Sequence, residues 1–317
     1  MVRAAHNVHG IPIVDIAPLR NGENAVGVGK ALHQASSEVG FIYIINHGIP
    51  ETVIATARDS ALKFFRKNEA QKMTVAINSA HRGYLGPGGA KMENHLEADA
   101  KESFIWGCEE LDRLSLKDHP LRGKNQWPDF MPGLKSIATD YFTRAQEVAR
   151  FLMQGFALGL DLPVNIFLRS SEKPLSRMSF VYYPPHHENK YGVGPHTDFG
   201  VLTVLYQDAV GGLEIESLDG TWVTAPPIPG TLLVNVGDLL ARWTNGAYRS
   251  TPHRVINRSD KERLSIVLAY DPEPDTVIDP REIFGPACDT QNDPITCGDY
   301  LTWRFEKAFS YRKAESN

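Results

Sequence analysis

The hydrophobic positions of this 317-residue chain follow a different spacing in its two halves. In the first half apolar residues recur at three- and four-residue steps, most clearly over 134–158, which predicts a long helix with one face on the core. Shorter helices are expected at 24–39, ended by Gly40, at 50–66 and at 69–77. Apolar, β-rich runs at 10–16 and 41–46 predict early strands.

From about residue 175 to 271 the pattern becomes a series of short β-rich runs separated by turns such as Gly211-Gly212 and Pro229-Gly230. Strands are expected at 177–183, 201–206, 212–216, 231–236, 253–257 and 264–270. Regular short strands of this kind predict a sandwich or barrel. The fold class is therefore mainly β with flanking α-helices.

The chain has no stretch with the composition of a linker, so a single domain over 1–317 is expected. It would comprise a helix-rich part at about 1–174, a β core at about 175–271 and a C-terminal helical extension over 272–317. The Gly- and Pro-rich stretch 78–133 is expected to be irregular, either a lid or pocket wall or a solvated loop.

Composition excludes several classes of protein. With 33 Lys and Arg against 38 Asp and Glu, the net charge is −5, which argues against nucleic-acid binding. Apolar runs such as 41–45 are too short to span a bilayer, and no secretory leader is evident. Cys108, Cys288 and Cys297 lack C-x-x-C spacing and indicate reduced thiols. A cytoplasmic monomer or weak homo-oligomer is expected.

A His followed two residues later by an acid is expected about once by chance in such a chain, yet three pairs occur. They are His95 with Glu97, His186 with Glu188, and His196 with Asp198. The first two lie in polar loops and are expected to be solvated. His196 and Asp198 precede an apolar run, where a sheet can hold their side chains rigidly.

Two His and one carboxylate on one face of a metal are typical of non-haem Fe(II) oxygenases. His253, at the start of another predicted strand, is the candidate third ligand. Arg263 and Ser265 follow on the next strand and share a face, so both can bind one carboxylate. Singly, His196 or Arg263 would be read as structural or surface residues; their order along successive strands favours a site.

At these residues the chain resembles the 2-oxoglutarate/Fe(II)-dependent dioxygenases of the isopenicillin N synthase-like group, from Ile11 to about Tyr270. The markers are Ile11-Pro-Ile-Val-Asp15, Gly40-Phe41, Asn46-His-Gly-Ile49, Arg82-Gly-Tyr84, Lys101-Glu102, Tyr182-Tyr-Pro-Pro185, His196-Thr-Asp198, Asp208, Gly211-Gly-Leu213, Asn235-Val-Gly-Asp238, Thr244-Asn-Gly246, His253-Arg-Val255 and Arg263-Leu-Ser265.

The resemblance implies a distorted double-stranded β-helix, or jelly roll, with Fe(II) on His196, Asp198 and His253. It also implies 2-oxoglutarate and O2 as co-substrates, with the distal carboxylate of the oxoacid on Arg263 and Ser265. Tyr183 matches a family tyrosine that often contacts the oxoacid. Many relatives have Asn two residues before this tyrosine, whereas this chain has Val181.

The expected reaction is oxidative decarboxylation of 2-oxoglutarate to succinate, coupled to hydroxylation, desaturation or a similar oxidation of a small molecule. Candidate pocket walls are Tyr84, Phe104, Thr203, Leu205 and Leu213. His47 is interpreted as structural. The motifs do not identify the substrate.

Four alternatives remain. An oxidase of the same fold can dispense with the oxoacid while keeping Arg-x-Ser, and an ethylene-forming enzyme would oxidise 2-oxoglutarate itself. A zinc hydrolase could use the same three ligands but would leave Arg263 and Ser265 without a task. A scaffold protein without chemistry would not need the intact ligand set.

Overall fold

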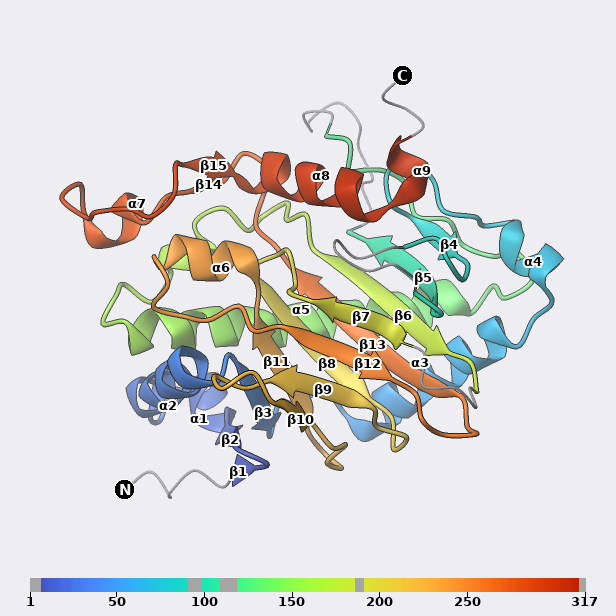
Figure 1. Ribbon diagram of the computed structural model, residues 1–317, viewed down its shortest axis with the longest axis horizontal. Coiled ribbons are helices and arrows are strands. Elements are labelled where there is room, and N and C mark those ends of the chain that lie inside the picture. The colour runs from blue at the N-terminus through green and yellow to red at the C-terminus, as the bar shows by residue number, and fades with distance from the viewer. Residues whose placement is uncertain (1–6, 91–98, 109–118, 186–190, 314–317) are drawn as a thin grey trace.

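Two β-sheets face each other at the centre of this computed structural model, which describes residues 7–90, 99–108, 119–185 and 191–313 (Figure 1). The main sheet has the strand order β1-β2-β3-β11-β8-β13-β6-β5-β4. In that order its strands are β1 (Asn7–Val8), β2 (Ile11–Asp15), β3 (Phe41–Ile45), β11 (Leu232–Val236), β8 (Leu202–Gln207), β13 (Arg263–Tyr270), β6 (Arg177–Tyr183), β5 (Glu102–Gly107) and β4 (Gly83–Leu85).

The minor sheet has the order β10-β9-β12-β7. Its strands are β10 (Trp222–Thr224), β9 (Leu213–Glu216), β12 (His253–Ile256) and β7 (Tyr191–His196). The inner faces of the two sheets share one buried cluster, which includes Tyr43, Leu205 and Leu233 of the main sheet and Val193 and Ile215 of the minor sheet. This is the jelly-roll sandwich that the resemblance implies.

Helices flank the two sheets. The helices are α1 (Ala17–Asn21), α2 (Ala25–Glu38), α3 (Glu51–Phe65), α4 (Glu69–Met73), α5 (Leu134–Gly159), the 3-10 turn η1 (Ile166–Leu168), α6 (Asp238–Trp243), α7 (Arg281–Phe284), α8 (Cys297–Ala308) and α9 (Ser310–Lys313). The buried stripe of α5 packs on α2, α3 and the sheet. No helix in the described ranges combines the length and the apolar composition needed to cross a bilayer.

Glycines set the close approach of α2 and α5. A Cβ on Gly159 would lie 2.4 Å from the carbonyl oxygen of Gly29, so the two backbones meet at a distance that a side chain would prevent. Helix α2 is capped by Asn24, whose side chain accepts from the Gly27 amide. After α2 comes the predicted stop at Gly40, which has φ of +77° and lies against Arg249 and Thr251.

The six strands predicted between 175 and 271 are confirmed as β6, β8, β9, β11, β12 and β13. The expectation that 78–133 is irregular is wrong for β4 and β5. Strand β5 is buried over its whole length and pairs with β6, with Phe104 opposite Phe180. The strand was not predicted because the surrounding Gly and Pro residues are typical of loops. The helix expected over 69–77 ends at Met73, because Ala76 bridges to Tyr84 instead.

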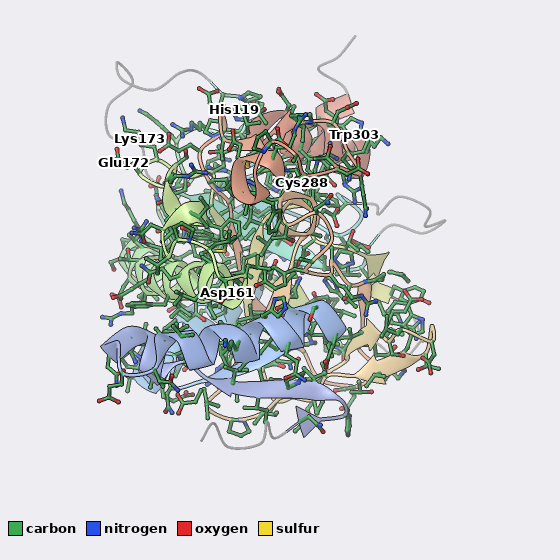
Figure 2. All side chains as sticks on the ribbon, turned by 90° about the vertical axis from the view of Figure 1, so that its left-hand side faces the viewer. His119, Asp161, Glu172, Lys173, Cys288 and Trp303 are labelled. Atoms are coloured by element: carbon green, nitrogen blue, oxygen red, sulfur yellow. The ribbon has the colours of Figure 1, made fainter. Side chains whose placement is uncertain are left out.

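The C-terminal segment runs across the end of the sandwich. It carries the short ribbon of β14 (Val277–Ile278) and β15 (Ile295–Thr296), followed by α8, which lies along the top of Figure 1 in red. Figure 2 shows His119 and Trp303 at this same end of the molecule. His119 packs so closely on Gly298, at the start of α8, that a Cβ there would lie 2.5 Å from its Nε2.

Candidate metal centre

The two candidate histidine ligands are direct neighbours across the pair of strands β7 and β12. His196 is the last residue of β7, His253 is the first residue of β12, and the two are register partners. Their ring centroids are 4.2 Å apart. Asp198 follows β7 by two residues, and its Oδ1 lies 3.8 Å from His196 Nε2 and 3.7 Å from His253 Nε2. One ligand atom from each residue therefore lies within 4.8 Å of the other two.

Backbone carbonyls orient both imidazoles. His196 Nδ1 lies 2.8 Å from the carbonyl oxygen of Gly194, and His253 Nδ1 lies 3.2 Å from that of Thr251. A carbonyl oxygen only accepts, so each Nδ1 carries the proton and each Nε2 presents a lone pair toward Asp198. The edge of the Phe41 ring, with its centroid 5.2 Å from that of His253, also restrains the second imidazole.

Two donors hold the Asp198 carboxylate by one oxygen. Thr203 Oγ1 donates to Asp198 Oδ2 at 2.5 Å, and Asn235 Nδ2 donates to the same oxygen at 2.8 Å. Oδ1 is the oxygen that faces the imidazoles. The loop that carries Asp198 is fixed as well, because the Asp238 amide donates to its carbonyl oxygen at 2.7 Å. Asn235 and Asp238 belong to one of the sequence markers, but this supporting role was not predicted.

The electrostatics of the three groups match the donor set that Fe(II) needs. Burial is the main cause that holds the pKa of His196 well below its ordinary range, and the adjacent His253 acts in the same direction. Burial by itself would raise the pKa of Asp198, but its interactions with His253 and His196 and the hydrogen bonds from Asn235 and Thr203 lower it. The centre thus offers the neutral imidazole of His196 and a charged carboxylate at neutral pH.

Arg263 and Ser265 lie beside this centre on the inner face of β13. They are 1% and 2% exposed, and Arg263 is the register partner of Tyr183 on β6. The guanidinium carbon of Arg263 lies 4.6 Å from the centroid of the Tyr183 ring. Val181 is the partner of Ser265, so the position at which many relatives have Asn faces the hydroxyl.

The donors at this end of the site are incompletely satisfied. Arg263 Nε donates to the carbonyl oxygen of Gly211. Among the described residues, no hydrogen-bond partner exists for Arg263 Nη1 or Ser265 Oγ, although both atoms are buried. Burying a charged donor without an acceptor costs several kcal/mol, on the order of 2–5. A carboxylate is the ligand that satisfies both atoms, so the residues fit the distal end of an oxoacid.

A cavity of about 190 Å³ between the two sheets contains both groups of residues. Of the predicted pocket walls, Thr203, Leu205 and Leu213 line it. Tyr84 and Phe104 do not, because side chains alternate along a strand and these two point to the helix side. Tyr84 donates to Glu102 at 2.6 Å, and Phe104 packs on Phe64.

Residues that the sequence did not indicate complete the cavity. Leu85, Ser103 and Ile105 supply the wall on β4 and β5, and Phe309 reaches the cavity from the segment between α8 and α9. His81 lies against Phe309 and Tyr311, with its Nδ1 hydrogen-bonded to the Tyr311 hydroxyl. These residues come from segments far apart in the chain, which sequence spacing does not relate.

The remaining histidine candidates play no part in this centre. His47 is buried, and its Nδ1 accepts from the Ile49 amide at 3.2 Å, in keeping with a structural role. The pairs His95 with Glu97 and His186 with Glu188 lie outside the described residues.

Comparisons with known proteins agree with this geometry. The model of the 2OG-Fe(II) oxygenase superfamily matches residues 174–272, and one described as the N-terminal region of non-haem dioxygenase in morphine synthesis matches 11–130. A Glycine max protein named homoarginine-6-hydroxylase is 35% identical over 301 residues, covering 87% of this chain and 89% of that protein. The chain belongs to the 2-oxoglutarate/Fe(II) oxygenase superfamily.

Other relatives of this oxygenase differ in their named reactions and ligands. A 1-aminocyclopropane-1-carboxylate oxidase of Dictyostelium mucoroides is 31% identical over 304 residues, covering 84% of this chain and 83% of its own. A full-length Neurospora crassa protein, crystallised with alpha-KG and thymine, superposes with a TM-score of 0.84 at 27% identity, over 96% of this chain and 99% of that one. The oxygenase is an oxidoreductase that uses Fe(II) and 2-oxoglutarate to oxidise a small molecule.

Proposed function

We propose that His196, Asp198 and His253 hold the Fe(II) of this oxygenase on one face. Asp198 Oδ1 lies 3.8 Å from His196 Nε2 and 3.7 Å from His253 Nε2, so the three ligand atoms already converge. The other polar atom of each side chain, Nδ1 or Oδ2, is engaged in a hydrogen bond. Three protein ligands leave coordination positions for the oxoacid and O2.

Arg263 and Ser265 bind the distal carboxylate of 2-oxoglutarate, and the Tyr183 ring covers the guanidinium. The observation that carries this assignment is the pair of buried, unsatisfied donors, Arg263 Nη1 and Ser265 Oγ, in the cavity that also contains the three ligands. Opposite Ser265, Val181 contributes only an apolar contact, so the hydroxyl depends on the oxoacid for its hydrogen bond.

When bound, iron and the oxoacid supply oxidation of a substrate C–H bond by O2, with release of succinate and CO2. The chain itself orients the ligand side chains and provides a site from which water is excluded. Thr203 and Asn235 fix Asp198, the carbonyls of Gly194 and Thr251 fix the imidazoles, and Phe309 adds an apolar ring to the cavity wall. Hydroxylation is the outcome best supported, because the relative with 35% identity is named a hydroxylase.

An oxidase that needs no oxoacid is the second candidate. It is favoured by the 31% identity to an aminocyclopropane-carboxylate oxidase, and the Arg-x-Ser motif does not exclude it. Substrate oxidation in the absence of 2-oxoglutarate would support it.

The whole chain 1–317 acts as one oxygenase domain, because a single buried cluster joins Ile16, Leu152, Leu268 and Leu301 from its three parts. It acts in the cytoplasm as a monomer or weak homo-oligomer, without nucleic acid. The three free thiols and the net charge of −5 support this setting.

The test is anaerobic loading of the purified protein with Fe(II) and 2-oxoglutarate, followed by air. One equivalent of iron, a weak visible charge-transfer band and the appearance of succinate are expected. Protein with iron bound that forms no succinate would contradict the proposal.

A further inference from the structure

Lys101 brings a positive charge into the cavity that neither the metal ligands nor the oxoacid anchors require. It immediately precedes β5 and lines the cavity with Ser103 and Ile105, which alternate with it on the same face of the chain. Its side chain is 16% exposed, so the ammonium is largely withdrawn from solvent. A lysine is rarely buried to this extent without a partner.

The partner is Asp99, which fixes the lysine beside the strand that ends in His196. Asp99 Oδ2 lies 3.3 Å from Lys101 Nζ, and its Oδ1 accepts from the Gly194 amide of β7 at 3.3 Å. The Ala100 amide also donates to the carbonyl oxygen of Tyr191 in β7, at 3.5 Å. Asp99 itself is buried and does not line the cavity, so it contacts the Lys101 ammonium from the protein interior and not from the cavity side.

This placement puts Lys101 at the end of the cavity that contains the metal centre. Asp99, which pairs with Lys101, accepts from the amide of Gly194, and the carbonyl oxygen of that same Gly194 lies 2.8 Å from His196 Nδ1. Lys101 also lines the same cavity as His196 and His253. Lys101 therefore lies near the ligand end of the cavity, where a substrate must lie to be oxidised.

The charged and polar residues that line the cavity indicate which functional group the substrate carries. Among the described lining residues the one carboxylate is Asp198, which is assigned to the metal, so a substrate amine meets no free acid there. An ammonium has three N–H donors, of which Asp99 can take one, leaving others for an incoming anion. Ile105, Leu205 and Val267 supply apolar walls for the rest of the molecule.

We propose that Lys101 anchors a carboxylate of the substrate that is oxidised, so that this oxygenase acts on small organic acids with an apolar body. The inference rests on the proposed function, since it takes Asp198 and Arg263 as already engaged by iron and oxoacid. Asp99 is the positioning residue that directs the ammonium into the cavity.

The experiment compares small acids with their primary amides, using phenylacetate with phenylacetamide and hexanoate with hexanamide. Each is titrated into anaerobic protein holding Fe(II) and 2-oxoglutarate, and the perturbation of the charge-transfer band gives the dissociation constant. For the wild type the acids should bind at least about tenfold more tightly than the amides. Lys101→Met should reduce this ratio to about one, and Lys101→Arg should keep most of it.

The matched control is Lys30→Met on the exposed side of α2, which should leave the ratio unchanged. Asp99→Asn should lower the ratio while Fe(II) is still bound, which a merely structural role would not produce. A panel in which no acid binds better than its amide, or a ratio that survives Lys101→Met, overturns the inference.

Two further outcomes separate this inference from the proposed function. If Lys101→Met raises the KM for 2-oxoglutarate instead, the lysine serves the oxoacid and the substrate assignment is wrong, while the function stands. If the wild type shows no band at all, the iron and oxoacid assignments fail first, and the inference falls with them.

Discussion

Asn235 on β11 donates a 2.8 Å hydrogen bond to Oδ2 of Asp198, the oxygen turned away from the two histidines. The bond leaves Oδ1 as the metal-facing atom and keeps the carboxylate plane fixed. Groups that orient metal ligands in this way typically contribute about 10- to 100-fold to metal affinity.

Asn235→Ala should therefore weaken Fe(II) binding by about 10- to 100-fold, measured by anaerobic titration with Fe(II). Thr203→Val, which removes the other donor to Oδ2, should act in the same direction. Thermal unfolding of both metal-free variants checks that the fold is retained. Unchanged affinity in folded Asn235→Ala would refute the orienting role.

Arg263→Met should weaken 2-oxoglutarate binding by about 10- to 150-fold, the usual effect of losing a charged hydrogen bond of 1.5–3 kcal/mol. In the metal-loaded wild type, 2-oxoglutarate should raise Tm by mass action, and this rise should disappear in the variant. Arg263→Lys should recover only part of the affinity, because an ammonium does not reproduce the guanidinium fork. Equal affinities for wild type and variant would place the oxoacid elsewhere.

His81 should make the stability of the metal-free protein depend on pH. Burial first, and then the charges of Arg177 and Arg82, hold its pKa well below 6.5. The unfolded chain therefore binds the proton more readily. The contribution of neutral His81 is complete above pH 6.5 and is lost as the pH falls below it, at up to about 1.4 kcal/mol per pH unit.

Denaturant unfolding at several pH values between about 5 and 7.5 measures this slope. His81→Asn is the informative variant, because the residue has a φ of +60°, which Asn tolerates. Its unfolding free energy should vary less steeply with pH than that of the wild type. Identical slopes would show that other groups cause the dependence.

Side chains of β5 point alternately into the cavity and toward the helices. Substitutions on the first face should therefore change substrate selection, and substitutions on the second should change stability. Ile105 lines the cavity, so Ile105→Trp should reduce the space for substrate and change which small acids bind, while the KM for 2-oxoglutarate stays nearly constant. Phe104→Leu, on the helix side, should lower the unfolding free energy by about 1–2 kcal/mol without changing that selection. A changed selection in Phe104→Leu would contradict the assignment of faces.

The jelly-roll core and the three proposed ligands could be predicted because they lie in one regular stretch of alternating strands and turns. His253 and Arg263 each stand at the start of a strand that the pattern predicts, or one residue before it, whereas β7, the strand that ends in His196, was not expected. Strand pairing then brings His196 and His253 together without any further constraint.

The rest of the site depends on contacts that sequence spacing does not encode. Strand β5 lies among glycines and prolines, so Lys101 and Ile105 were not recognised as cavity residues, and Phe104 was wrongly taken as a pocket wall. Phe309 meets His81 across more than half of the chain length. Asn235 could have been found, because it is the polar residue of an otherwise apolar strand, Leu232–Val236.

The most direct test of the central claim is an anaerobic crystal structure of the protein with Fe(II) and 2-oxoglutarate. The account predicts one ion bonded to His196 Nε2, Asp198 Oδ1 and His253 Nε2, with the distal carboxylate of the oxoacid on Arg263 and Ser265. An ion bound without one of these three side chains, or an oxoacid that leaves Arg263 without a contact, would contradict it.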